Sequence, residues 1–263
     1  MVKRILGKAY IWLILLVMYA PLLTLFVFSF TEAKNIGSWT GFSFRLYLDM
    51  FKNEEIMTAL LNTILIATSA AIVSTIIGTL GAIGIFYSSK KMRKAFDLVG
   101  QIPVMNAEIV TAISLTILFV FFGIKFNFVT LLIGHVVLTI PFVVLSITPK
   151  LKQLDPNIYE AALDLGSTPR RALWRVIIPE ILPGIISGFM LSITLSLDDY
   201  IITAFTRNNS FSTLSTYVYG ATAKKGALPP TLRALSTVIT LLVLAVLLII
   251  NIKVKKPVTK KVK

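Results

Sequence analysis

Cysteine is absent from this chain of 263 residues, so disulfide bonds and thiolate metal sites are excluded. A single histidine, His135, is also too few for a histidine-based metal site. Charged residues are scarce at 14%, whereas 56% of the residues are hydrophobic and the mean hydropathy is +0.84. Such a chain is far more apolar than a soluble globular domain. We therefore predict an all-α integral membrane protein.

The chain also lacks a Gly-x4-Gly-Lys-Ser/Thr phosphate-binding loop, and no nucleophile can be paired with a base from the sequence. We predict no catalytic residues, no metal and no cofactor, so any energy for its activity must come from a partner. The net charge of +14 would suggest nucleic acid in a soluble protein. Here the cations lie mainly between apolar runs, where they orient a chain in the bilayer, so we predict no nucleic-acid partner.

Six apolar stretches are each long enough to cross the hydrocarbon core, which takes about 20 helical residues. They cover residues 9–30, 57–88, 99–123, 127–148, 181–206 and 233–252. The first follows a basic N-terminus but is too long for a signal peptide and lacks a small-residue cleavage site, so we expect a retained span. The chain then divides into a first helix with an extracellular loop (1–56), a helical core (57–252) containing a cytoplasmic loop (149–179), and a basic tail (253–263).

The distribution of cations predicts the orientation of these spans. An even number of spans puts both termini on one side of the membrane. The termini with the second and fourth loops carry 18 of the 26 cations, so the positive-inside rule places them in the cytoplasm. The fifth loop fits this assignment least well, because it carries four of the remaining eight: Arg207, Lys224, Lys225 and Arg233.

Glycines recur at helical spacing in two of the predicted spans. Gly78, Gly81 and Gly84 follow each other at i, i+3 and i+6, and Gly184 and Gly188 form a GxxxG pair. Both patterns permit close contact between helices. The alternative is that glycine is simply common in membrane helices.

The cytoplasmic loop at 149–179 has the pattern of two short helices. We expect Asp155 to cap the first helix, with Pro156 at its first position and Gly166 at its end. Thr168 and Pro169 then begin the second helix. The loop is therefore predicted to be a compact helical hairpin.

This hairpin combines small, aromatic and basic side chains: Ala161, Ala162, Arg170, Arg171, Leu173, Trp174 and Arg175. A large aromatic beside arginines is typical of residues that anchor a protein interface. The same pattern also suits an amphipathic helix that lies on anionic lipid. Both interpretations remain open from the residues alone.

Three acids lie within the predicted spans, namely Glu108, Asp198 and Asp199. Each charge at mid-membrane costs roughly 2.5 to 3.5 kcal/mol on insertion scales, so it needs compensation. A continuous helix over 181–206 aligns four polar side chains in a stripe, Ser192, Ser196, Asp199 and Thr203, with Asp198 about 100° away. Such acids would complement a linear polycation in a translocation pathway.

These acids also have structural interpretations. Asp198 and Asp199 could pair with a basic residue, cap a broken helix of a partner subunit, or include one protonated carboxyl group. His135 is alone on the apolar fourth span, and we expect it to be a hydrogen-bonded core residue.

The hairpin sequence resembles the signature E-A-A-x3-G-x9-I-x-L-P of membrane subunits of bacterial ATP-binding-cassette importers. The chain matches it at Glu160, Ala161, Ala162, Gly166 and Pro179. Val176 and Ile178 replace the Ile and Leu of the pattern and keep the apolar volume. The resemblance implies a permease with six transmembrane helices and the MetI-like fold of type I importers, in the bacterial cytoplasmic membrane.

The resemblance also implies roles and partners. Residues Gly166 to Leu173, which include Ser167, Thr168, Arg170 and Arg171, would form or border the coupling helix that seats in a groove on an ATPase. Glu160 and Ala161 would support that helix. The implied partners are a second homologous permease in a heterodimer, two cytoplasmic ATP-binding subunits, an extracellular binding protein and the lipid bilayer.

Within this family the chain most resembles spermidine/putrescine permeases, in its N-terminal span and at Asn62–Thr63, Leu195–Tyr200 and Ser215–Tyr219. This implies polyamine import. Permeases for thiamine, iron, phosphonate or molybdate share the loop signature, so that signature does not identify the cargo. Two rivals differ in class: a secondary transporter in which Glu108, Asp198 and Asp199 couple protons, and a membrane anchor that transports nothing.

Overall fold

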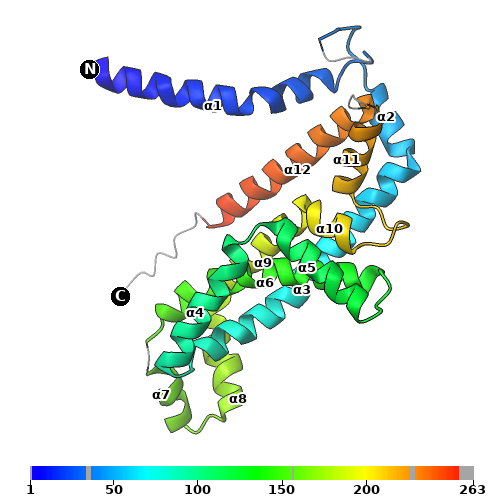
Figure 1. Ribbon diagram of the computed structural model, residues 1–263. Coiled ribbons are helices and arrows are strands. Elements are labelled where there is room, and N and C mark those ends of the chain that lie inside the picture. The colour runs from blue at the N-terminus through cyan, green and yellow to red at the C-terminus, as the bar shows by residue number, and fades with distance from the viewer. Residues whose placement is uncertain (1, 34–36, 156, 226–228, 255–263) are drawn as a thin grey trace. The chain divides into compact units, whose positions relative to one another are not determined.

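The computed structural model describes residues 2–33, 37–155, 157–225 and 229–254. Regular structure in this part of the chain is entirely helical, which confirms the predicted all-α class (Figure 1). The elements are α1 (Val2–Phe28), α2 (Arg45–Lys52), α3 (Glu54–Phe86), α4 (Lys90–Met105), α5 (Glu108–Phe121), α6 (Phe128–Lys152), α7 (Ile158–Asp164), α8 (Pro169–Ala172), η1 (Leu173–Ile177), α9 (Ile178–Asp198), α10 (Ile201–Thr206), α11 (Leu214–Lys225) and α12 (Pro230–Val254).

The helices belong to two compact units, which we describe separately. Unit 1 contains Met1–Met57 and Val218–Lys263, and unit 2 contains Thr58–Tyr217. The chain passes from the first to the second within α3 and returns within α11. The predicted division at 56 and 252 stays a prediction, and most of the predicted basic tail, 255–263, lies outside the described residues together with Pro156.

In unit 1, α12 packs against α1 and α2. Arg233 of α12 is only 1% exposed, and its guanidinium donates to the backbone carbonyl oxygens of Phe28 and Ala33. Phe28 is the last residue of α1, where carbonyl groups lack partners within the helix and carry partial negative charge. The prediction that Arg233 belongs to a loop is therefore wrong, because it is a buried residue of α12 that bonds to the end of α1, while its side of the membrane stays a prediction.

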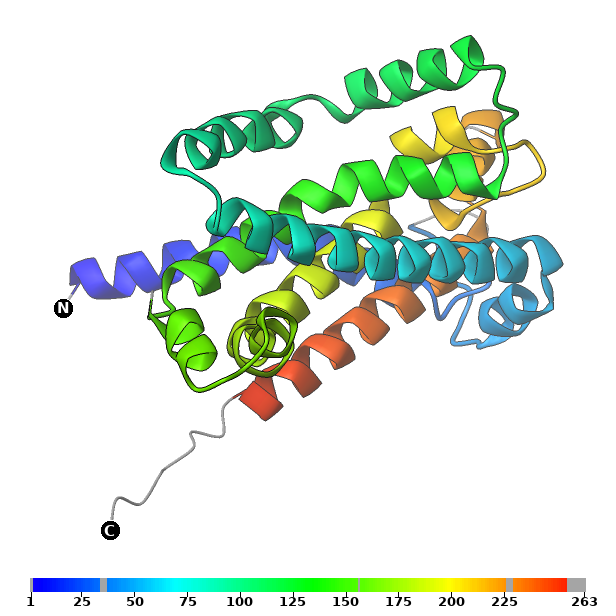
Figure 2. The same cartoon turned by 90° about the horizontal axis from the view of Figure 1, so that it is seen from below.

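The core of unit 2 lies where α3, α6 and α9 meet, and Figure 2 shows α3 in cyan running beside α6 in green. Its buried side chains are Ala82, Ile83, Val143, Ile147, Leu151, Ile177 and Ile181. Partly buried Ile158 and Tyr159 of α7 pack against the same core. The predicted hairpin is thus attached to the helix bundle through its first helix.

Glycine allows these helices to approach closely. A methyl group added at Gly188 of α9 would lie 3.2 Å from the Val143 Cγ1 of α6, and one added at Gly184 would lie 3.2 Å from the Ser146 carbonyl oxygen. Both distances are tighter than ordinary van der Waals contact. The predicted close contact of the GxxxG pair is confirmed, with α6 as the partner helix.

The glycines of α3 differ from one another. A methyl group at Gly78 would lie 2.7 Å from the Val143 Cγ1 and 2.9 Å from its Cβ. At Gly81 and Gly84 no atom of the described chain lies within 4 Å of such a group. Close contact is therefore confirmed for Gly78 and wrong for the other two within this chain.

Four helical stretches in the described residues are long and apolar enough to cross a membrane: Tyr10–Phe28, Glu54–Phe86, Phe128–Lys152 and Pro169–Asp198. They correspond to the first, second, fourth and fifth predicted spans. The sixth predicted span falls in α12, a helix of 25 residues. The total of six spans stays a prediction.

The third predicted span is not one helix. α4 ends at Met105 and α5 begins at Glu108, because Asn106 and Ala107 are extended with ψ of 143° and 133°. An acid in the first turn favours a helix start, since the helix N-terminus carries partial positive charge. The apolar part of this region is therefore the 14-residue helix α5, and the prediction of a single helix over 99–123 is wrong.

We expect Gly78→Ala to destabilise the chain by about 1 to 3 kcal/mol, because the new methyl group overpacks against the branched Cβ of Val143. Gly81→Ala is the matched control on the same helix, and it should be neutral or stabilising by up to about 1 kcal/mol. Thermal denaturation of the purified chain in detergent measures both. Equal midpoints for the two variants would contradict the close packing of α3 on α6.

Candidate functional site

The fifth predicted span is interrupted at its two acids. α9 ends at Asp198 and α10 begins at Ile201. Between them Asp199 adopts an extended backbone conformation, with φ of −64° and ψ of 125°. The prediction of one continuous helix over 181–206 is therefore wrong at this point.

The side chain of Asp199 explains the break, because it caps the helix that follows. Its Oδ1 accepts the Ile202 N–H at 3.0 Å, and its Oδ2 accepts the Thr203 N–H at 2.8 Å. The Thr203 hydroxyl donates to the same Oδ2 at 2.8 Å. A carboxylate at a helix N-terminus satisfies free N–H groups and interacts favourably with the helix dipole. Asp199 is 6% exposed, so this capping takes place out of solvent.

His135 of α6 lies between the two helices that flank the break. Its Nδ1 is 2.7 Å from the Ser196 Oγ of α9, and its Nε2 is 2.9 Å from the Thr203 Oγ1 of α10. The same Nε2 is 3.6 Å from the Asp199 Oδ2. The imidazole is fully buried, which confirms the expectation of a hydrogen-bonded core histidine.

The predicted polar stripe is buried as a whole. Its exposed fractions lie between 0 and 6% for Ser192, Ser196, Asp199 and Thr203. Ser192 continues the polar contacts toward α3, since its Oγ is 2.8 Å from the Ser74 Oγ. The stripe therefore holds helices together and is not an open wall of a cavity.

The other two acids are exposed. Asp198 is the last residue of α9, and Glu108 is the first residue of α5. α5 packs against α10, and the Glu108 carboxylate lies within electrostatic range of Asp199 and Asp198. The three acids singled out from the sequence are thus neighbours. Within this chain Asp198 and Glu108 are exposed, whereas Asp199 is buried.

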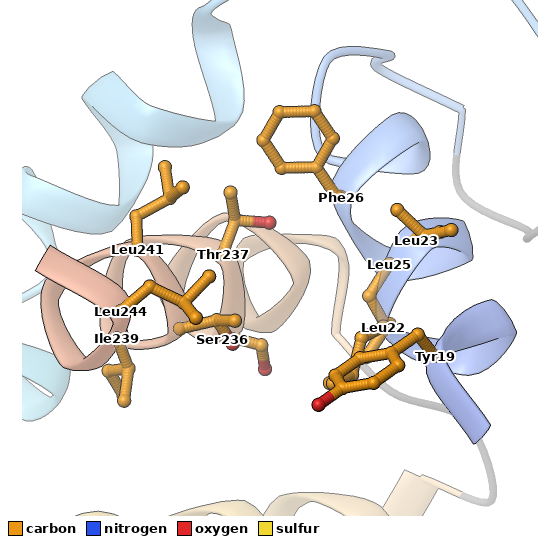
Figure 3. Close-up of a pocket in the computed structure, with 11 residues that line it drawn as sticks. Tyr19, Leu22, Leu23, Leu25, Phe26, Ser236, Thr237, Ile239, Leu241 and Leu244 are labelled. Carbon is orange, nitrogen blue, oxygen red and sulfur yellow. The ribbon is translucent and has the colours of Figure 1, made fainter. Parts of the chain in front are cut away.

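A separate cavity of about 460 Å³ lies in unit 1 between α1 and α12 (Figure 3). It is lined by Tyr19, Leu22, Leu23, Leu25, Phe26, Ser236, Thr237, Ile239, Thr240, Leu241 and Leu244. No carboxylate belongs to this lining, and most of its surface is hydrocarbon. The cavity therefore offers nothing that pairs with a cationic solute.

The hairpin between α6 and α9 has helix boundaries close to those predicted from the sequence. α7 ends at Asp164, Gly166 has a φ of +83°, and the Thr168 side chain accepts the Arg171 N–H at the start of α8. The predicted end of the first helix at Gly166 and the predicted start of the second at Thr168 are confirmed. The prediction that Asp155 caps the first helix is wrong. That helix begins only at Ile158, because the Asp155 carboxylate accepts the Asn157 N–H at 2.9 Å and forms a turn there.

The tip of this hairpin is an uncovered surface. Leu165 is 88% exposed and Trp174 is 59% exposed. Most residues of the signature region are exposed, whereas Ser167 is half-buried and Ala162 is buried. The exposed ones are Glu160, Ala161, Gly166, Thr168, Arg170, Arg171 and Pro179. Exposed large apolar groups among arginines mark a surface for interaction. Figure 1 shows α7 and α8 at the opposite end of unit 2 from α10.

One continuous helical stretch joins this tip to the exposed acid. Pro169–Asp198 runs for 30 residues, which is about 45 Å at 1.5 Å per residue. Its turn at Leu173–Ile177 is π-helical, with the Ile178 N–H bonded to the Leu173 carbonyl oxygen. Pro179 follows and lacks the N–H that an α-helical pattern needs, so a widened turn is accommodated here.

Sequence reasoning missed three features of this site: the break after Asp198, the π-helical turn before Pro179, and the bridging role of His135. Asp199 followed four residues later by Thr203 could have indicated a cap. The partners of His135 lie 61 and 68 residues away in sequence, and no local pattern reveals such pairs.

Residues 74–255 match the family described as "Binding-protein-dependent transport system inner membrane component". The chain is 32% identical to the spermidine/putrescine transport system permease protein PotC of Haemophilus influenzae, over 97% of this chain and 99% of the relative. It is 31% identical to PotC of Escherichia coli K12, over 95% and 93%. It is also 31% identical to the putrescine transport system permease protein PotI of that strain, over 84% and 81%.

Solved structures share the fold. A chain of a bacterial ABC transporter involved in import of the acidic polysaccharide alginate aligns with a TM-score of 0.72 at 16% identity, covering 97% of this chain and 96% of that one. A second structure, of the alginate transporter with a periplasmic protein bound to an alginate pentasaccharide, also gives 0.72 at 16% identity, over 98% and 95%. At this identity the likeness concerns the fold alone.

Adjacent acids should differ sharply in their effect on stability. Asp199→Ala removes the acceptor of three hydrogen bonds and should lower the free energy of unfolding by about 3 kcal/mol. Asp198→Ala changes an exposed side chain and should cost less than about 0.5 kcal/mol. Thermal denaturation in detergent tests the pair, and similar losses would contradict the capping role of Asp199.

Proposed function

The chain belongs to the family of binding-protein-dependent transport system inner membrane components, and from this we propose that it is the permease subunit of an ATP-driven polyamine importer. As a member of that family it is a multi-pass inner-membrane transport component of bacteria and not an enzyme. The cargo proposal is carried by one observation. Relatives named as spermidine/putrescine or putrescine permeases match the chain over 84 to 97% of its length.

The exposed acids support a cationic cargo. Asp198 and Glu108 present two carboxylates in the same region of unit 2. A polyamine carries ammonium groups along a flexible chain, and two separated carboxylates can pair with two of them. The buried Asp199 adds negative charge to this region without contacting the cargo, since its oxygens are occupied by backbone and hydroxyl donors.

The hairpin supports coupling to an ATPase. In our proposal its exposed tip around Leu165, Gly166 and Trp174 seats in a groove on a cytoplasmic ATP-binding subunit, where ATP is hydrolysed. Movement of the tip is transmitted along Pro169–Asp198, because one continuous helical stretch carries the tip at one end and the acid at the other. The acid would then face alternately outward and inward.

The complete transporter in this proposal pairs the chain with a second homologous permease in a heterodimer. Two ATP-binding subunits bind on the cytoplasmic side, and a polyamine-binding protein delivers cargo from outside. Both termini and the hairpin lie in the cytoplasm, as the excess of cations in those segments supports.

Uptake of labelled spermidine and putrescine into proteoliposomes that hold the complete complex tests the proposal. We expect uptake only when both ATP and the binding protein are present. Uptake without ATP that a protonophore abolishes would favour a secondary transporter. ATP hydrolysis without movement of either polyamine would agree with an ATP-driven importer but would refute polyamines as its cargo.

Two glycines with the same backbone requirement test the role of the hairpin. Gly166 and Gly123 both have positive φ, of +83° and +66°, and both are exposed, with no atom of the described chain within 4 Å of where a Cβ would lie. Valine at either position therefore meets similar backbone strain of about 1 to 2 kcal/mol. We expect only Gly166→Val to reduce ATP-dependent uptake, by roughly tenfold for about 1.4 kcal/mol of lost docking energy.

Gly123→Val should retain uptake in the same assay, since Gly123 lies after α5 and outside the hairpin. Co-purification of each variant with the partner subunits reports whether it assembles. Equal uptake by the two variants would refute the coupling role of the tip.

A further inference from the structure

The break between α9 and α10 is held from three directions by polar contacts. His135 of α6 contacts Ser196 before the break and Thr203 after it. On the other side, the Ser215 hydroxyl of α11 donates to the Asp199 carbonyl oxygen at 2.7 Å. The Asp199 side chain itself caps α10. The main chain and the side chain at the break are therefore both fixed by hydrogen bonds.

The directions of these hydrogen bonds can be assigned from their acceptors. An ionised Asp199 can only accept, so the Thr203 hydroxyl donates its proton to the Oδ2 at 2.8 Å. Thr203 must then accept from His135, which places the imidazole proton on Nε2. The unprotonated Nδ1 is left to accept the Ser196 hydroxyl proton at 2.7 Å. A neutral ring thus satisfies every partner in a chain from Ser196 through His135 and Thr203 to Asp199.

This arrangement determines where the exposed acid stands. Asp198 directly precedes the break and is two residues after Ser196, so the His135–Ser196 contact fixes the last turn of α9 that carries it. The His135–Thr203 contact fixes the first turn of α10, which packs against the helix that begins at Glu108. His135 therefore sets the relative position of the two exposed carboxylates without touching either one.

We propose that His135 is a positioning residue for transport: by bridging Ser196 and Thr203 across the helix break, it holds the Asp198 carboxylate where the cationic cargo passes. The bridge itself follows from the hydrogen-bond geometry. Its consequence for transport rests on the polyamine permease function proposed above.

A double-mutant cycle in the complete transporter tests this consequence. We expect His135→Leu, which removes both hydrogen bonds of the bridge, to reduce spermidine uptake by roughly five- to tenfold. Asp198→Asn should also reduce uptake. If His135 acts through Asp198, adding His135→Leu to Asp198→Asn should cause no further loss, whereas a merely structural role predicts that the two losses multiply.

Thr139→Val is the matched control. Thr139 is buried on α6 one turn from His135, and its hydroxyl donates only within its own helix, to the His135 carbonyl oxygen at 2.8 Å and more weakly to that of Val136. We expect this variant to keep wild-type uptake. If His135→Leu does not assemble, Ser196→Ala and Thr203→Val take its place in the cycle, since each removes one side of the bridge.

The bridge can also be observed directly, because His135 is the only histidine in the chain. Nitrogen-15 NMR of the complex, with labelled histidine in this subunit alone, should show a neutral ring protonated at Nε2. Ser196→Ala should shift the Nδ1 resonance and Thr203→Val the Nε2 resonance, while Thr139→Val should shift neither. A proton on Nδ1, or a doubly protonated ring, would overturn the assigned directions of these hydrogen bonds, and a ring that responds to neither Ser196→Ala nor Thr203→Val would overturn the bridge.

The uptake measurements and the NMR spectrum distinguish failure of the positioning role of His135 from failure of the proposed polyamine cargo. Multiplying losses in the cycle, or a His135→Leu variant as active as Thr139→Val, would overturn the positioning role even if spermidine is the cargo. A complex that moves neither polyamine would refute the proposed cargo, and the positioning of Asp198 for that cargo would fall with it. The NMR spectrum would in that case still decide whether His135 bridges the break.

Discussion

A buried carboxylate must be paired with donors, and in unit 2 the Asp199 carboxylate imposes this constraint on its surroundings. An unpaired charge inside a helix bundle costs several kcal/mol, whereas three donors from one helix start can compensate it. The chain meets the requirement by ending α9 at Asp198 and beginning a new helix whose N–H groups point at Asp199. The break, the orientation of α10 and the exposure of Asp198 all follow from that pairing.

The same constraint links the two ends of unit 2. Because α9 extends as far as Asp198, the helical stretch from Pro169 to Asp198 is uninterrupted apart from its π-helical turn. Glycine contacts at Gly184 and Gly188 pack this stretch tightly on α6, which also carries His135. In our proposal, this tight packing lets a displacement at the hairpin tip reach the region of the exposed acids.

Much of this could be predicted from the sequence where the signal is local. The apolar runs indicated a helical membrane protein, Gly166 and Thr168 marked the ends of the hairpin helices, and the GxxxG pair indicated a close contact. These features depend on backbone propensities and spacing within a few residues. The hairpin signature likewise pointed to a family that the whole-chain comparisons then showed.

The remainder depends on pairs that are distant in sequence. Apolar runs appear continuous across Asn106 and Asp199, so hydropathy alone merges helices that polar contacts separate. Arg233 was counted as a loop charge because its carbonyl partners, 205 and 200 residues earlier in the chain, are invisible to a local pattern. The surface acid and the buried acid at 198 and 199 could not be told apart for the same reason, since only the capped helix distinguishes them.

In our proposal, exposed carboxylates beside the helix break admit a polycation whose movement is driven by a partner ATPase. The decisive experiment is ATP-dependent uptake by the complete complex of spermidine, putrescine and acetylated spermidine, compared between the wild type and Asp198→Asn. Wild-type uptake should fall as ammonium groups are removed from the cargo, and this dependence should weaken in the variant. Uptake that is independent of cargo charge, or equally dependent on it in both proteins, would contradict a role for Asp198 in admitting the polycation.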